Sequence, residues 1–196
     1  MKPLLILALA LVFLSSCATT NLTVTKNVTL QNLPVDWTYS NRVDSEYLPN
    51  LDSVMLNILY QFNGTKHSFT IHKRQADEPY GLTFSFGRGK FTGEDEIAVS
   101  YLVSALGLIG APITMLSATD GKGVLFFWYF AADHIQINAS LSPELARPNG
   151  QSVSGMIQSG ATFSNKKARM DRICEGVNDY VYSTLLNLDK NNNTGK

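Results

Sequence analysis

The stretch NKKARMDRICEGVNDYVYSTLLNL, residues 165–188, carries the strongest structural pattern in the chain. Its apolar side chains recur at intervals of three and four residues, which places them on one side of an α-helix. We therefore predict a long amphipathic helix from about Asn165 to Leu188, with Ser164 as its N-cap. Residues 191–196 contain no apolar side chain, so a disordered tail is expected there. The apolar stripe consists of Met170, Ile173, Cys174, Val177, Tyr180, Val181, Thr184, Leu185 and Leu188.

Upstream of this helix, the hydrophobic pattern changes to the period of two that marks a β-strand. Every second residue from Ile135 to Leu141 is apolar, so one face of this strand is expected in the core. The run VLFFWYF at 124–130 is apolar on both faces, as in a central strand. Together the two runs are too long for one strand of so small a domain, which predicts a bulge or corner near 131–133.

Further strands are predicted from shorter runs of apolar residues in the rest of the chain. Asn63 and Gly64 separate two such runs, and because both residue types tolerate positive φ they favour a hairpin. The sequence Gly87-Arg88-Gly89-Lys90 is expected to form a turn after the strand that precedes it. The predicted strands span residues 22–30, 54–62, 67–73, 80–86 and 153–163.

Between these strands, residues 97–119 form 23 consecutive positions without a charge. Thr92 can cap a helix at this point, and the acidic residues 94–96 suit the first helical turn, where the helix dipole favours negative charge. Glycines and Pro112 interrupt the middle of the run. We therefore favour a buried helix packed on the sheet and followed by a turn. The alternatives are a hairpin that dips into a membrane or docks on a partner, and a transmembrane span.

The order of these elements predicts an α+β fold. We expect a mostly antiparallel sheet with one apolar internal helix and a long amphipathic C-terminal helix packed on it. The 196 residues suffice for one domain, which we place at residues 22–190. Lys and Arg together number 16, as do Asp and Glu, so the formal net charge is zero. Because no positive surplus is available, binding to nucleic acid is not expected.

The N-terminal residues predict where the protein resides. Lys2 precedes an uncharged run, Leu4–Leu14, that is too short to span a bilayer, as in a signal peptide. The run ends in Leu14-Ser15-Ser16-Cys17, which resembles the lipobox of bacterial lipoproteins. The resemblance implies that residues 1–16 are removed and that Cys17 carries acyl chains, which anchor the protein to a membrane of the cell envelope.

The same resemblance defines the start of the mature chain. Residues 17–21 are then a short lipidated tether, and Ala18 in place of an aspartate implies sorting to the outer membrane of a two-membrane envelope. Once Cys17 is acylated, Cys174 is the other cysteine of the chain, so no intrachain disulfide is expected.

Two groups of residues are candidate contact sites. Four cations crowd the first two turns of the C-terminal helix, where the helix dipole disfavours them. Such a departure predicts contact with anionic lipid or an acidic partner, and a solvated helix face is the alternative. Large side chains of the apolar segments could instead line a groove, with core packing as the alternative. The first group is Lys166, Lys167, Arg169 and Arg172, and the second is Leu102, Leu106, Phe126, Trp128 and Phe130.

The sequence predicts no catalytic centre, metal site or cofactor. A Gly-X-Ser-X-Gly motif is absent from it. His67 and His72 would lie on opposite faces of one strand, so they cannot share a metal ion. Cys174 belongs to the apolar stripe and is expected to be a core residue rather than a nucleophile.

The expected function follows from the anchor and the order of elements. That order is similar to the layout of small envelope lipoproteins that serve as accessory subunits, which implies a non-catalytic interaction protein. Its partners would be the membrane, through the acyl chains, and an envelope protein or anionic lipid. The alternative is a carrier that binds an apolar ligand or lipid in a groove between the sheet and residues 97–116.

Overall fold

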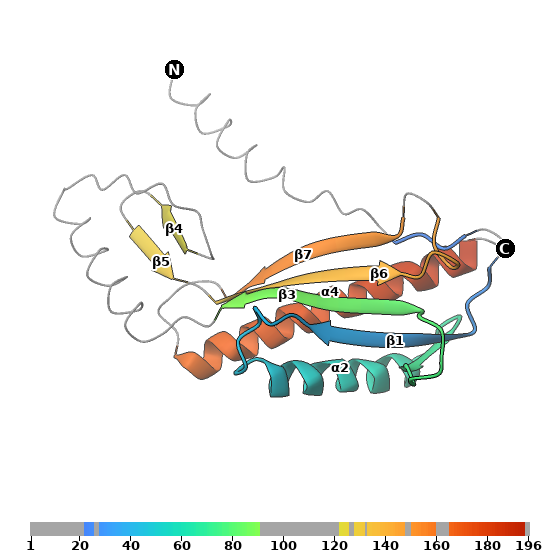
Figure 1. The fold of residues 1–196 in the computed structure, drawn as a ribbon, viewed down its shortest axis with the longest axis horizontal. Coiled ribbons are helices and arrows are strands. Elements are labelled where there is room, and N and C mark those ends of the chain that lie inside the picture. Colours follow the sequence, from blue (N-terminus) through green and yellow to red (C-terminus); the bar gives the residue numbers. More distant parts are fainter. Residues whose placement is uncertain are drawn as a thin grey trace, which may run out of the picture.

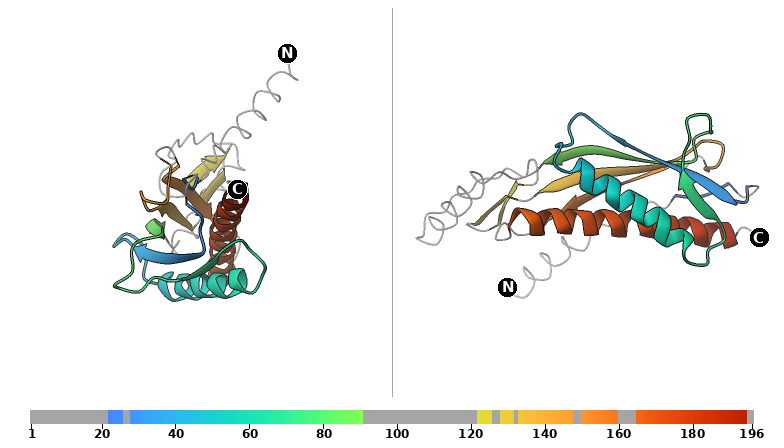
Figure 2. Two further views of the ribbon diagram at one scale, coloured as in Figure 1. Left: turned by 90° about the vertical axis from the view of Figure 1, so that its right-hand side faces the viewer. Right: turned by 90° about the horizontal axis from the view of Figure 1, so that it is seen from below.

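The computed structural model describes residues 22–25, 28–90, 122–125, 128–131, 133–147, 150–159 and 165–194. They form a five-stranded mixed sheet with two helices on one of its faces, so the α+β class is confirmed (Figures 1 and 2). A separate two-stranded sheet is also present. In chain order the elements are β1 (Asn32–Tyr39), α2 (Leu48–Asn63), β2 (Thr70–Lys73), β3 (Leu82–Lys90), β4 (Lys122–Leu125), β5 (Trp128–Ala131), β6 (His134–Leu141), β7 (Ser152–Gln158) and α4 (Lys166–Thr194).

The five-stranded sheet has the order β2-β1-β3-β6-β7. β1 runs parallel to both of its neighbours, β2 and β3. The pairings β3–β6 and β6–β7 are antiparallel, as is the β4–β5 pairing of the small sheet. Antiparallel pairing therefore prevails among the described strands, as predicted, but β1 makes the main sheet mixed. The parallel β1–β2 pairing is possible because α2 carries the chain back between the two strands.

The prediction of a strand over residues 54–62 is wrong, because this segment belongs to helix α2. Its buried residues are Leu51, Met55, Ile58 and Phe62, whose spacing of three and four residues is helical. The expected hairpin at Asn63-Gly64 is also wrong, since these residues end the helix. The Asn63 side chain bonds the backbone of Ile71 in β2 at 2.7 and 2.9 Å.

The predicted strand over residues 22–30 is replaced by an extended segment with a single bridge, Val24 to Ala146. The alternation nevertheless identified buried positions correctly, since Leu22, Val24 and Leu30 are all at most 6% exposed. The strand that does pair in the sheet, β1, follows directly after this segment and was not predicted.

The core lies between the sheet and the two helices. Figure 2 shows α2 and α4 side by side against the same face. The alternation predicted for β6 and for residues 80–86 is confirmed: apolar residues at every second position of β3 and β6 are buried. The stripe of the C-terminal helix is confirmed as well, with Cys174 and Tyr180 half-buried at its margin. The core residues of these two strands are Leu82, Phe84, Phe86, Ile135, Ile137, Ala139 and Leu141.

Residues 124–130 do not form one central strand, which corrects the sequence-based prediction. Leu125 pairs with Trp128, so the run folds back on itself as β4 and β5. A break before His134 separates β5 from β6, in agreement with the corner expected near 131–133. The turn predicted at 87–90 is instead part of β3, with a register shift between Phe86 and Gly89. The internal helix predicted between 92 and 119 lies outside the described residues.

Helix α4 extends to Thr194, so the prediction of a disordered tail is wrong for residues 191–194. The side chain of Asn192 is buried and bonds both the N–H and the C=O of Leu30, at 2.9 and 3.3 Å. Asn191 donates to the carbonyl of Leu22 at 3.0 Å. These bonds fasten the N-terminal segment to the C-terminal end of α4. No helix in the described part of the chain has the length and apolar character that crossing a bilayer requires.

Candidate functional site

The cationic residues predicted to form one contact site lie at the start of α4 but in different environments. Asn165, and not Ser164 as predicted, caps this helix, because its side chain accepts a hydrogen bond from the Ala168 N–H at 2.8 Å. Arg169 is only 2% exposed, so its assignment to a surface site is wrong. Its guanidinium points at the end of the sheet instead of the solvent, because a carboxylate lies there.

That carboxylate belongs to Asp133, which is fully buried directly before β6. Arg169 Nε lies 3.2 Å from Asp133 Oδ2. Ser159 holds the backbone of Asp133 on both sides: Asp133 N–H donates to Ser159 Oγ at 3.1 Å, and Ser159 N–H donates to Asp133 O at 2.9 Å. The pair therefore joins the first turns of α4 to the ends of β6 and β7.

Burial around this ion pair also affects Tyr47. Its side chain is buried, and burial raises the pKa of its hydroxyl far above the usual range. The negative charge of Asp133 acts in the same direction. Tyr47 therefore stays protonated and uncharged.

The other three cations remain near the surface. Lys166 Nζ lies 2.6 Å from Glu46 Oε2, and Arg172 Nη1 donates to Ser159 O at 3.2 Å. Lys167 is exposed. A depression of about 480 Å³ lies at this position, and its rim carries both positive and negative charges. It is lined by Glu46, Asn50, Lys166, Lys167, Met170 and Asp171, which we call the α4 depression.

The groove predicted from the large apolar side chains stays a prediction, because most of its residues lie outside the described part of the chain. Leu102, Leu106 and Phe126 lie outside the described residues. Trp128 and Phe130 lie in β5, where their backbones pair with Leu125 and Gly123. Cys17, the predicted acylation site, is also outside the described residues.

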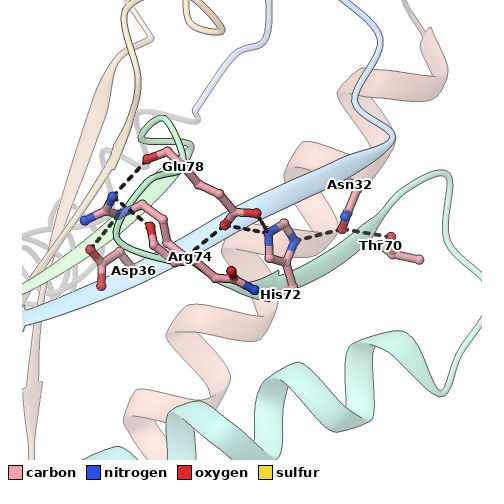
Figure 3. Close-up of polar contacts among 7 residues, drawn as sticks. Asn32, Asp36, Thr70, His72, Arg74 and Glu78 are labelled. Atoms are coloured by element: carbon pink, nitrogen blue, oxygen red, sulfur yellow. Dashed lines mark hydrogen bonds and ion pairs between the residues drawn. The ribbon is translucent and has the colours of Figure 1, made fainter.

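A second polar cluster, which the sequence did not predict, joins β2 and the loop of residues 74–80 to β1 (Figure 3). His72 Nε2 lies 3.0 and 3.1 Å from the two carboxylate oxygens of Glu78, and its Nδ1 lies 2.8 Å from Asn32 Oδ1. Arg74 Nε donates to Asp36 Oδ2 at 3.0 Å. A backbone bond from Gln75 and the contact with His72 lower the pKa of the Glu78 carboxyl. Because these groups use each other as partners, we interpret the cluster as a latch that holds loop 74–80 against β1.

In a third cluster, hydrogen bonds connect a hydroxyl, an imidazole and a carboxylate in a row. Thr65 Oγ1 lies 2.7 Å from His67 Nε2, and His67 Nδ1 lies 3.0 Å from Asp189 Oδ2. Asp189 also accepts hydrogen bonds from the N–H and hydroxyl of Ser68. Burial alone would raise the pKa of Asp189, but the bonds from Ser68 and His67 outweigh it and lower the pKa.

The arrangement matches the order of a catalytic triad, but its electrostatic setting is unfavourable for nucleophilic attack. The Thr65 hydroxyl also donates to the Phe62 carbonyl at 3.0 Å, at the C-terminal end of α2. The carbonyls at a helix C-terminus carry negative potential, which would destabilise an oxyanion. We interpret this cluster as a second latch, which ties α4 to the end of α2.

The two histidines therefore have separate partners, Asp189 and Glu78. No group of three metal-ligating side chains occurs among the described residues. Sequence reasoning missed Asp189, although a signal exists: Asp189 and Asn192 follow Leu185 and Leu188 at a spacing of four, so they extend the buried stripe with polar side chains. Comparison with known proteins adds no identity, because no family model and no curated protein matches this chain.

Proposed function

We propose that this chain is a lipid-anchored protein of the bacterial cell envelope that acts as a non-catalytic interaction subunit, with the α4 depression as its contact site. The anchor part of the proposal is supported by the sequence Leu14-Ser15-Ser16-Cys17. The interaction part is supported by the position of the depression relative to the anchor.

The distance between Leu22, the first described residue after the predicted anchor, and the depression is the observation that carries the proposal. Leu22 is held by Asn191, near the C-terminal end of α4, whereas Met170 of the depression lies in the first turns. Asn191 and Met170 are 21 positions apart, which corresponds to about 32 Å of helix at 1.5 Å per residue. Figure 1 shows α4 extending along the length of the sheet.

The tether is shorter than this separation. Cys17 precedes Leu22 by five residues, which span at most about 17 Å when fully extended. An acylated Cys17 would keep the C-terminal end of α4 close to the lipid. The α4 depression could then face a partner away from that surface, with α4 as the rigid spacer.

The chemistry of the depression fits a protein partner. Its rim combines Lys166 and Lys167 with Glu46 and Asp171, and Met170 supplies an apolar contact. Mixed charges of this kind select a complementary polar surface better than a uniformly anionic lipid layer. The His67 and His72 clusters each join elements of the fold, which favours a scaffold over an enzyme. The carrier alternative stays a prediction, because the segment that would form its groove lies outside the described residues.

Site-specific crosslinking in cells tests this proposal. A photoreactive amino acid is placed at Lys167 in the full-length chain, and a matched control carries it at Asp77, an exposed residue of loop 74–80. We expect one dominant protein adduct from position 167, its loss with Cys17→Ala, and no such adduct from position 77. Equal products from both positions, or lipid adducts alone, would contradict the proposed contact site. Retention of the adduct and of membrane association in Cys17→Ala would contradict the anchor.

A further inference from the structure

The last strand of the sheet, β7, leaves one of its edges without a neighbour among the described strands. Its odd-numbered residues direct their backbone groups at β6, since Leu141 N–H donates to Gln151 O and Ser159 N–H donates to Asp133 O. Backbone groups alternate in direction along a strand. The N–H and C=O groups of Ser152, Ser154, Met156 and Gln158 therefore point away from β6.

The two edges of the sheet differ in how they are protected. β2 has four residues, includes Lys73, and its outward backbone groups at Ile71 bond the side chain of Asn63. β7 has seven residues with no charge and no proline, and Met156 on it is 58% exposed. Charges, prolines and covering loops are the usual means by which proteins prevent pairing at an edge. β7 lacks the charge and the proline, so its edge is suited to accept another strand.

We propose that this edge pairs antiparallel with β7 of a second copy of the chain. A two-fold axis at Gly155 places Ser152 opposite the second copy's Gln158 and Ser154 opposite its Met156. Each of the four residues whose backbone groups point away from β6 then lies opposite another such residue. Their N–H and C=O groups can therefore form hydrogen bonds across the junction.

The face of β7 toward α4 explains why a second copy fits this edge. In the same register Val153 lies opposite the second copy's Ile157, and Ile157 opposite its Val153. Both side chains are half-buried and pack at the margin of the core. Pairing would cover each of them with the other and extend the core across the junction. The absence of charge in β7 also removes the repulsion that identical charged strands experience when they pair.

Cysteine crosslinking in cells tests the pairing with the full-length chain. Ser154→Cys is made together with Cys174→Ala and treated with a short bismaleimide. Diagonal neighbours across an antiparallel pair lie about 7–8 Å apart, within reach of such a reagent. Ser85→Cys in the same background is the matched control, because Ser85 pairs with Asn138 on the same face, two strands further inside the sheet.

We expect a homodimer from Ser154→Cys and none from Ser85→Cys at equal labelling by a monofunctional maleimide. Adding Met156→Lys should reduce the homodimer at least fivefold, because it places two positive charges close to the axis, whereas adding Thr38→Lys on β1 should not. Equal dimer yields from both cysteine positions, no dimer from Ser154→Cys, or a dominant adduct with a different protein would each overturn the proposal. Limited proteolysis of every variant verifies that the fold is retained.

Discussion

Replacement of Arg169 by methionine tests whether the buried ion pair holds the start of α4 to the sheet. The side chains of Arg169 and Asp133 are 2% and 0% exposed, and their charged atoms lie 3.2 Å apart. Removing one member of a buried pair leaves the other charge without its counter-ion, which typically costs about 3–5 kcal/mol. For a domain of this size each kcal/mol lowers Tm by about 2–4 °C, so Arg169→Met should lower Tm by about 6–20 °C.

The double variant Arg169→Met with Asp133→Leu provides the critical comparison. Because it removes both charges and restores an apolar contact, we expect it to recover most of the lost stability. Urea unfolding followed by tryptophan fluorescence measures the free energy of unfolding of the parent, both single variants and the double variant. A cost below about 1 kcal/mol for Arg169→Met, or additive effects of the two substitutions, would refute our interpretation of a dehydrated pair.

Three further predictions concern the packing of α4. Gly176→Ala should lower the free energy of unfolding by about 1–2 kcal/mol, because a Cβ there would lie 2.5 Å from Ile157 Cγ2 and the overpacking outweighs the gain in helix propensity. Urea titration measures this difference, and an unchanged or higher stability would contradict the prediction. Asp189→Asn should lower the free energy of unfolding by about 1–3 kcal/mol, because it weakens the hydrogen bonds of this side chain with His67 and Ser68. Since the pKa of Asp189 is lowered in the folded protein, its contribution to the free energy of unfolding is present at neutral pH and is lost as the pH falls below about 4. The urea midpoint should therefore decrease less steeply with falling pH in Asp189→Asn than in the parent. Burial raises the pKa of the Cys174 thiol, so maleimide labelling at pH 7 should be slow in the folded chain and fast in urea, and equal rates would contradict the packing.

The elements that could be predicted are those whose faces differ in polarity. The stripe of α4 and the alternation in β3 and β6 are local patterns, and burial follows from them because each element has one apolar side. The strand prediction for residues 54–62 was wrong because the pattern was judged over too short a segment. This segment is rich in apolar residues and ends at Asn63-Gly64, which suggested a strand and a hairpin. The spacing of the buried residues from Leu51 to Phe62 is helical once residues 48–53 are included.

Which side chain each charged residue pairs with could not be predicted, because the pairing depends on distances between residues far apart in the sequence. Four cations at the start of α4 look equivalent in sequence, yet Arg169 alone is buried against a carboxylate 36 residues earlier in the chain. Likewise, Asp189 becomes the acceptor for His67 only because α4 passes the end of α2.

The sequence by itself determined the amphipathic helix, the buried faces of β3 and β6 and the residues available for an anchor, since each depends on neighbours within a few positions. The tertiary structure alone decided that β1 pairs parallel on both sides, that Arg169 leaves the surface, and that β7 has one strand neighbour among the described residues. Backbone and charged groups are satisfied by whichever partner the packed elements bring within hydrogen-bonding distance, and that distance is set only when the helices and the sheet come together.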